Sequence, residues 1–160
     1  MESASANLLN AMNKGTTPGQ QAKTLQCLSN SGVRTTTYWI VGHPHETETD
    51  FQATLDFITE NKDNIYEADM AVFTFCSDGE KETDIFSKDF GGIVERFSSE
   101  FDPLLIFKYY KLKDPRPNET ETFDRAVRFV EHMQKIGLPC NRFSAQDFIV
   151  LEKRWKRLCG

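Results

Sequence analysis

Residues able to do chemistry gather in one short stretch of this 160-residue chain, Gly42-His43-Pro44-His45-Glu46. Two histidines one residue apart can chelate a metal ion, but zinc sites add further cysteine, histidine or carboxylate ligands. No such partner stands at ligand spacing, and we do not expect zinc here. The glycine instead follows a run of β-branched and aromatic residues. Because α/β proteins bind ligands at the carboxyl ends of buried strands, the stretch predicts a ligand-binding turn.

The elements that must position this turn follow from the patterns on either side of it. Val33 to Val41 predicts a strand that is apolar on both faces toward its end, which is typical of a parallel strand covered on both sides. Thr47 and Asp50 form a capping-box-like helix start, and this helix should end near Asn61. Ala68 to Cys76 predicts a second strand of the same buried type. Together they predict a βαβ unit.

The residues before this unit predict two helices. Ser5 can cap a short helix that runs to Asn13. Thr17 followed by Pro18 favours a second helix start, because proline suits the first helical position, and Gly32 should end that helix.

The residues after the unit predict a mainly helical second half. Pro103 to Leu112 could be a strand or a buried helix, and hydrophobic periodicity does not decide between them. Phe123 to Ile136 has apolar residues at helical spacing and is followed by Gly137, which should end the helix. Ser144 should cap a last helix with a basic outer face, which a solvated surface explains better than a phosphate contact.

Cysteine usage and charge limit the function classes. The four cysteines form no C-x-x-C pair, which predicts free thiols in a reducing compartment. The net charge of -5 argues against a general nucleic-acid or membrane-surface binder, since both need a basic excess. No apolar run approaches the roughly 20 residues of a membrane span, and no signal-like segment opens the chain. We therefore expect a cytoplasmic protein without nucleic-acid or membrane partners.

Two segments of the first half together resemble a known family. "ESASANLLNAMNKGTT", from Glu2, precedes "GVRTTTYWIVGHPHETETDFQATLDFI", from Gly32. The pair resembles the back half of the radical S-adenosylmethionine (radical-SAM) domain, in the group of iron–sulfur oxidoreductases that often carries an N-terminal cobalamin-binding domain. The family pattern is E-S-G-S, a helix ending in M-N-K-G, and a strand ending in I-V-G-x-P-x-E-T. Each fragment alone is a weak motif, whereas both in order and at the family spacing are specific.

The resemblance implies an α/β fold built as a partial (β/α) barrel. The chain would begin near the end of the fourth barrel strand and supply the last two strands with their helices. Residues 1–92 would form the C-terminal part of the barrel, and residues 93–160 a mainly helical C-terminal extension. The C-x3-C-x2-C motif that holds the family's [4Fe–4S] cluster is absent. The N-terminal remainder of the parent barrel would therefore be a partner of this chain.

The resemblance also implies residues that bind S-adenosylmethionine. Glu2 stands where the family has an acidic residue near the ribose or the amino-acid part of the cofactor. A carboxylate there can accept hydrogen bonds from hydroxyl or ammonium groups. Ser3 and Ser5 flank Glu2; Ser3 is a candidate for the same site, and a helix cap is the simpler role for Ser5.

The second group of implied binding residues lies at the strand ends. Ile40, Val41 and Gly42 match the strand end that lies against the adenine, where an aliphatic side chain covers the ring and a glycine lets the backbone approach. Without the resemblance, a core strand end and a turn explain these three residues better. Phe75 ends the next strand, where the family often has an apolar residue near the adenine. Glu46 matches an acidic family position and could also complement the helix N-terminus.

A radical-SAM parent would use S-adenosylmethionine and a reduced [4Fe–4S] cluster to generate a 5′-deoxyadenosyl radical that abstracts hydrogen from a substrate. This chain would contribute part of the cofactor-binding wall, with no catalytic residue and no metal ligand. We therefore expect the isolated chain to be inactive. The parent could also bind cobalamin.

Two other interpretations stay open. The chain could be a non-catalytic binding or interaction module derived from that fold, with the helices after Thr120 as its working surface. It could also be an unrelated α/β domain with a chance match. A half barrel would leave a hydrophobic strand edge without its neighbour. We therefore expect either self-association or an extension that folds back over the open edge or face.

Overall fold

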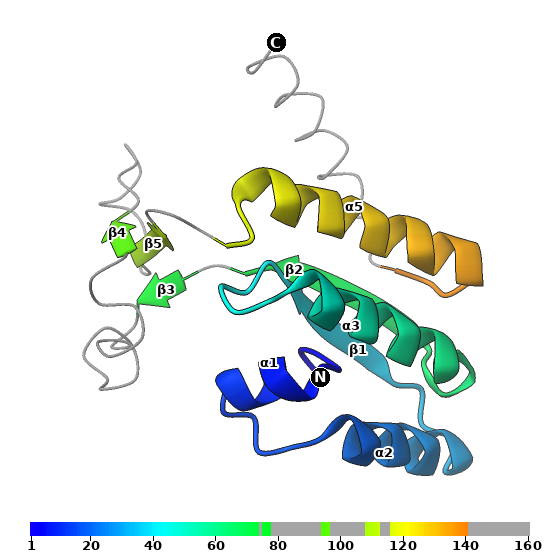
Figure 1. The fold of residues 1–160 in the computed structure, drawn as a ribbon. Coiled ribbons are helices and arrows are strands. Elements are labelled where there is room, and N and C mark those ends of the chain that lie inside the picture. The colour runs from blue at the N-terminus through cyan, green and yellow to red at the C-terminus, as the bar shows by residue number, and fades with distance from the viewer. Residues whose placement is uncertain (74, 78–93, 97–107, 113–115, 141–160) are drawn as a thin grey trace.

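The computed structural model of the chain describes residues 1–73, 75–77, 94–96, 108–112 and 116–140. These residues have a mixed α/β arrangement with a two-stranded parallel sheet, several helices and a separate three-stranded antiparallel sheet (Figure 1). The helices in these ranges fall short of the length and apolar character that a membrane span requires.

Two helices open the chain, and both begin where local capping chemistry predicts. The side chain of Ser5 accepts a hydrogen bond from the Leu8 amide at the start of α1 (Ala6–Ala11), which ends two residues before the predicted end at Asn13. At the start of α2 (Pro18–Asn30), Thr17 and Gln20 form a reciprocal capping box, with proline in the first turn.

The predicted βαβ unit is confirmed. β1 (Thr36–Val41) pairs in parallel with β2 (Glu67–Val72), with Trp39 opposite Met70. The connection is α3 (Glu48–Glu60), followed by a short 3-10 turn, η1 (Lys62–Asn64).

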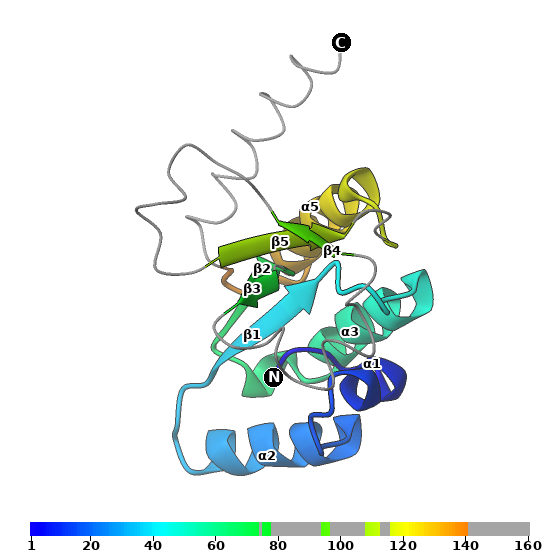
Figure 2. The same ribbon diagram turned by 90° about the vertical axis from the view of Figure 1, so that its left-hand side faces the viewer.

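The two faces of β1 differ in burial. Thr37, Trp39 and Val41 point to the side covered by helices and are buried. Tyr38 points to the other side, and 58% of its surface is exposed. The prediction that this strand is covered on both faces is therefore wrong. The physical reason is that α3 and the later helix α5 (Glu119–Ile136) contact each other on one side of the sheet (Figure 2).

The predicted strand Ala68 to Cys76 is wrong as a single element. β1 ends at Val41, and the last ladder bond runs from the Phe73 amide to the Val41 carbonyl at 2.8 Å. The chain of β1 turns away at Gly42, so the second strand has no partner beyond this point. The next residues, β3 (Phe75–Ser77), join a different sheet.

This second sheet is antiparallel, with strand order β3-β5-β4. β4 (Val94–Arg96) and β3 both pair with β5 (Lys108–Leu112). The segment Pro103 to Leu112, for which strand and helix were both open, is a strand over its last five residues, and its first five lie outside the described residues. The predicted last helix from Ser144 also lies outside them.

The predicted end of α5 at Ile136 is confirmed, and the helix begins at Glu119, four residues before Phe123, the first apolar residue of the predicted pattern. Asn118 and Glu121 form a capping box at its start, and Gly137 ends it in the left-handed conformation with φ 74°. Its buried side chains join the main core through Phe129 and Met133.

One hydrophobic core lies between the parallel sheet and the helices on its covered face. Trp39 lies near its centre, with its ring edge-on to that of Phe57 at a centroid distance of 5.9 Å, and donates from its indole nitrogen to the Thr37 hydroxyl. The side chains with no more than 1% of their surface exposed in this cluster are Leu25, Trp39, Phe51, Ile58, Ala68, Ala126, Phe129 and Met133.

Flanking segments reach both outer edges of the parallel sheet. The Ile40 amide of β1 donates to the Glu2 carbonyl at 2.9 Å, so the N-terminal segment lies beside β1 as a neighbouring strand would. On the other edge, the Ala68 amide of β2 donates to the Pro139 carbonyl at 2.9 Å. The chain after α5 therefore returns to the edge of β2.

Candidate functional site

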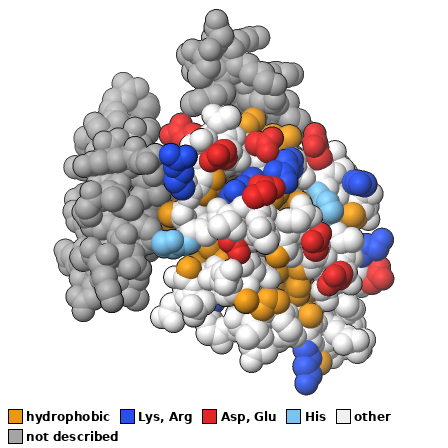
Figure 3. Space-filling view, viewed as in Figure 1, with side chains coloured by type: hydrophobic (Ala, Val, Ile, Leu, Met, Phe, Trp, Pro, Cys, Tyr) orange, Lys and Arg blue, Asp and Glu red, His pale blue; other side chains and the backbone are white. Residues whose placement is uncertain are grey.

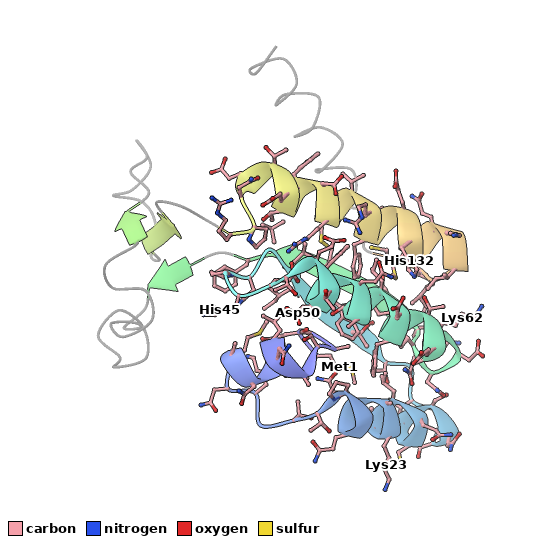
Figure 4. The ribbon with its side chains drawn as sticks, viewed as in Figure 1. Met1, Lys23, His45, Asp50, Lys62 and His132 are labelled. Carbon is pink, nitrogen blue, oxygen red and sulfur yellow. The ribbon has the colours of Figure 1, made fainter. Side chains whose placement is uncertain are left out.

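The predicted ligand-binding turn lies at the carboxyl end of β1 and leads into α3. Figure 4 shows His45 on this turn, and Asp50 where the start of α3 faces α1. The N-terminal segment reaches the same place through the Ile40–Glu2 main-chain hydrogen bond. The two sequence segments that carry the family resemblance are thus neighbours in space.

Glu2 is a partly exposed acidic group beside the end of β1. Its carboxylate forms an ion pair with Lys14 at 2.6 Å, and the two side chains are 35% and 38% exposed. An exposed pair of this kind contributes about 1 kcal/mol or less to stability. Both charged groups can therefore change partners at little cost.

Ser3 is buried and already has its partners. It is 1% exposed, and its hydroxyl accepts from the Ser5 amide at 3.0 Å and lies 3.5 Å from the Thr54 hydroxyl. The Thr54 hydroxyl also accepts from the Ala4 amide at 3.2 Å. Ser3 thus connects the N-terminal segment to α3. Because its hydroxyl is buried and hydrogen-bonded, Ser3 could hold neighbouring residues in place but would not contact a ligand directly.

Ile40 and Val41 point to opposite faces, because side chains alternate along a strand. Val41 is 2% exposed and belongs to the core on the helix-covered face. Ile40 is partly exposed on the same face as Tyr38. Only Ile40 of this pair can contact a molecule lying on the open face.

Gly42 has a steric reason to be glycine. Its φ is +84°, and a Cβ at this position would stand 2.3 Å from the Thr122 Cγ2 of α5. Its amide donates to the Glu46 Oε2 at 2.9 Å. The close approach that the glycine permits is therefore used by α5 of the same chain.

A buried ion pair joins this turn to α5. The Arg125 guanidinium donates to the Glu46 side chain at 2.9 Å and to the Glu46 carbonyl at 3.0 Å, and the two side chains are only 9% and 2% exposed. Burial raises the pKa of Glu46, while the hydrogen bonds from the Gly42 amide and from Arg125 oppose that rise. Arg125 also contacts Glu48 at 3.2 Å, and Glu48 holds Arg128 at 2.5 Å.

Sequence reasoning missed Arg125. The available signal was its position in α5 beside the buried stripe of Ala126, Phe129 and Met133, where a charged residue needs a partner. Sequence spacing gave no means of identifying Glu46, far away in the chain, as that partner.

Asp50 connects the starts of two helices. It accepts from the Thr47 amide at 3.0 Å and from the Thr47 hydroxyl at 2.6 Å in the α3 capping box, and it also accepts from the hydroxyl of Ser5, the N-cap of α1. Burial would raise the pKa of Asp50, but the hydrogen bonds from Ser5 and Thr47 outweigh it and leave the pKa lowered. Ser5 is thus a helix cap, as the simpler interpretation held.

His43 is buried beside the N-terminal segment. It is 6% exposed, and its ring lies edge-on to Phe73 at a centroid distance of 4.7 Å. Its Nδ1 accepts from the His45 amide at 3.2 Å. Burial lowers the pKa of His43 to about 4; His45 and Lys14 add to this, and Glu2 opposes it.

The other predicted groups are only partly described. Phe75 lies in β3, paired with Tyr110, and its side chain lies outside the described part of the structure. Cys27 is an exposed free thiol. The described ranges contain no group of three or more His, Cys, Asp or Glu side chains that could hold a metal ion.

The residues of this chain fit S-adenosylmethionine in part, and they do not provide the ligands of a [4Fe–4S] cluster. For S-adenosylmethionine, Glu2 offers an accessible carboxylate and Ile40 an accessible aliphatic side chain, while Ser3, Val41 and Gly42 have structural partners. For a [4Fe–4S] cluster, the C-x3-C-x2-C ligand motif does not occur in the sequence.

Comparison with known proteins gives no assignment. The chain matches no protein-family model, and no curated protein matches it.

Proposed function

We propose that this chain supplies one wall of an S-adenosylmethionine site in a radical-SAM enzyme, as the C-terminal portion of a partial (β/α) barrel. The observation that carries the proposal is the 2.9 Å bond from the Ile40 amide to the Glu2 carbonyl. It sets the E-S-A-S segment beside the I-V-G-H-P-H-E-T segment, at the carboxyl end of a parallel strand. This is the end of the sheet at which α/β proteins bind ligands.

The proposed roles follow from accessibility. The Glu2 carboxylate would accept hydrogen bonds from ribose hydroxyls or from the ammonium group of the cofactor. Ile40 would cover one face of the adenine from the open side of β1. Ser3, Val41 and Gly42 would hold these two in place. When bound, S-adenosylmethionine and a reduced [4Fe–4S] cluster on the N-terminal remainder of the barrel supply the radical chemistry.

Calorimetric titration with S-adenosylmethionine tests the proposal. We would compare this chain with the full-length gene product after anaerobic reconstitution of its cluster. We expect binding to the full-length product, and no turnover by this chain alone. In the full-length product, Glu2→Gln should weaken binding about tenfold or more, because hydrogen bonds to charged groups contribute about 1.5–3 kcal/mol.

Two matched controls separate this role from other effects. Lys14→Met breaks the same surface ion pair but leaves the Glu2 carboxylate in place, so it should change the affinity little. Glu67→Gln removes a carboxylate at the opposite end of the same sheet and should leave binding unchanged. Equal losses in all three variants, or a folded full-length product that does not bind the cofactor, would contradict the proposal.

A non-catalytic module is the second candidate, and the packing of α5 favours it. Thr122 fills the space beside Gly42, and Arg125 is ion-paired to Glu46, so α5 closes the helix side of the turn. The surface over α3 and α5 carries acidic and basic side chains side by side (Figure 3). A folded protein that fails to bind S-adenosylmethionine would favour this candidate, and its partner should then recognise a surface of mixed charge.

A further inference from the structure

The outer edge of β1, on the side away from β2, is paired near its end and open at its start. The Ile40 amide donates to the Glu2 carbonyl at 2.9 Å, so the main-chain groups of Ile40 point away from β2. Because this direction alternates along a strand, Thr36 and Tyr38 point their N–H and C=O groups to the same outer edge. Both residues are exposed, and within the described residues no main-chain hydrogen bond reaches these outward groups. This part of the edge can therefore accept another strand.

Two further observations mark the same end of the sheet. Among the described residues, the large apolar side chains that stay exposed are Val33, Tyr38 and Tyr66, at 48%, 58% and 50%. Tyr66 lies at this end because its amide donates to the Thr35 carbonyl at 3.0 Å. The hydroxyl oxygen of Thr35 is buried and has no hydrogen-bond partner in the described part of the chain, which is uncommon for a buried polar atom. Exposed apolar side chains beside an unpaired edge are typical of a protein interface.

The residues along this edge do little to prevent pairing between molecules. Natural edge strands often carry lysine or proline for that purpose, and the segment Val33–Tyr38 contains neither. Its charged residue is Arg34, whose guanidinium lies over the Tyr66 ring, 5.1 Å from the ring centroid. The threonines and the tyrosine of this segment favour a strand. The edge is thus suited to form further main-chain hydrogen bonds.

We propose that β1 pairs at this edge with β1 of a second copy of the chain, antiparallel and about a two-fold axis beside Thr37. Thr36 then lies opposite Tyr38 of the second copy, and each such pair exchanges both of its main-chain hydrogen bonds. The two side chains of a pair share the open face of the sheet, where an aromatic ring packs well against a β-branched residue. This inference goes beyond the proposed function and requires no cofactor.

The space along the edge fits a second copy in this register. The Glu2 carbonyl already lies beside Ile40, so an added strand has room only beside the first residues of β1. In the proposed register, the position beside Ile40 falls to Arg34 of the second copy, which lies outside β1 and need not follow the edge. The outward groups of both copies are therefore satisfied without displacing Glu2. The N-terminal remainder of a full-length barrel would compete with the second copy for this edge.

Sizing chromatography with light scattering at several concentrations tests the proposal on this chain. We expect a mass of twice 18.4 kDa at high concentration. Thr36→Pro removes an outward N–H but no hydrogen bond of the β1–β2 ladder, and Tyr38→Lys places a charge at the edge. Each should raise the dimer dissociation constant about tenfold or more. Ala71→Lys is the matched control, because Ala71 is exposed on the same open face but belongs to β2, and it should dimerise as the unmodified protein does.

Amide hydrogen exchange and NMR locate the interface. The amides of Thr36 and Tyr38 should exchange slowly in the dimer and fast in the monomer of Tyr38→Lys. In a mixture of differently labelled copies, Thr36 of one copy should contact Tyr38 of the other. If Thr36→Pro does not fold, Tyr38→Lys and the labelled mixture decide.

Two results would overturn the inference. The first is a monomer at every concentration, and the second is a dimer that both edge variants leave intact. Neither measurement depends on cofactor binding, so failure here leaves the proposed function to its own calorimetric test.

Discussion

At the scale of single residues, the turn after β1 depends on buried polar side chains with fixed partners. Glu46 is held by the Gly42 amide and by Arg125, and His43 is held by the His45 amide. A buried charge is tolerable only when it is paired. The shape of the turn is therefore coupled to α5 through individual atoms.

Removing one partner of the buried ion pair should strongly destabilise the protein. We expect Arg125→Met to lower the free energy of unfolding by about 3–5 kcal/mol, because the Glu46 carboxylate would stay buried without its cation. Urea unfolding monitored by circular dichroism measures this. Arg128→Met is the control, since that half-exposed pair with Glu48 should cost about 1 kcal/mol or less. The double variant Glu46→Gln/Arg125→Met should recover part of the loss, and a small effect of Arg125→Met alone would contradict the account.

His43 should make the stability depend on pH. Its pKa is about 4 in the folded protein and near the ordinary 6.5 in the unfolded chain, so the unfolded chain binds the extra proton first. The stabilisation is fully present above pH 6.5 and is lost as the pH falls toward about 4. Chemical unfolding at several pH values should show this loss in the unmodified protein and a flatter profile for His43→Phe. The same slope in both proteins would show that His43 is not the group responsible.

At the scale of elements, helix starts fasten separate segments together. Asp50 completes the α3 capping box by accepting from Thr47, the N-cap, and it also accepts from Ser5, the N-cap of α1. Thr122 of α5 packs directly on Gly42 at the end of β1. Each of these contacts joins two elements that are distant in sequence.

Loss of the Asp50 carboxylate, which both capping hydroxyls contact, should affect both helix starts. We expect Asp50→Ala to lower the free energy of unfolding by about 2–3 kcal/mol, since one cap contributes about 0.5–2 kcal/mol and two helix starts depend on this carboxylate. Asp56→Ala, on the exposed side of α3, is the control and should cost less than 1 kcal/mol. Amide hydrogen exchange should show faster opening of α1 in Asp50→Ala. Unchanged protection of α1 would mean that the Ser5–Asp50 contact does not couple the helices.

Because Thr122 of α5 lies against Gly42, any side chain at residue 42 should lower the stability of the protein. We expect Gly42→Ala to cost about 2–5 kcal/mol, because the alanine would have an unfavourable positive φ and its Cβ would overlap the Thr122 methyl. Thr122→Ala should relieve only the overlap, so the double variant should be more stable than the sum of the single effects implies. Thermal unfolding of the four proteins measures this coupling, and strict additivity would contradict the contact.

At the scale of the whole molecule, the parallel sheet of β1 and β2 is extended at both edges, within the described residues, by segments outside these strands. The N-terminal segment pairs with β1 at Ile40, and the segment after α5 pairs with β2 at Ala68. The open face keeps Tyr38 exposed. The proposed remainder of the barrel, or a second copy of the chain, would have to engage that face.

These edge contacts should appear in amide hydrogen exchange. We expect slow exchange at Ile40 and Ala68, although both amides point away from the β1–β2 ladder, because each has a carbonyl partner at 2.9 Å. Deleting residues 1–3 should speed exchange at Ile40 and leave Ala68 slow. Sizing chromatography of both proteins shows whether removing the edge segment promotes self-association. Fast exchange at both amides in the intact chain would contradict this arrangement.

The sequence by itself determined the features that depend on nearby residues. The starts of α1, α2 and α3 were predictable, because a capping side chain bonds to amides only two or three residues ahead. The end of α5 was predictable from Gly137, and the parallel pairing of β1 and β2 from their helical connection. The E-S-A-S and I-V-G-H-P-H-E-T segments also indicated which strand end to consider as a site.

Only the tertiary structure decided which face of β1 is open, where the second strand ends, and which groups meet at the turn. Spacing along the chain does not show that Arg125 reaches Glu46, that Thr122 fills the space beside Gly42, or that Ser3 is buried. These contacts join residues tens of positions apart, and their partners are selected by packing around a common core. Local propensity does not show which distant residues become neighbours in the core. The burial of a side chain and the pairing of a charge depend directly on those neighbours.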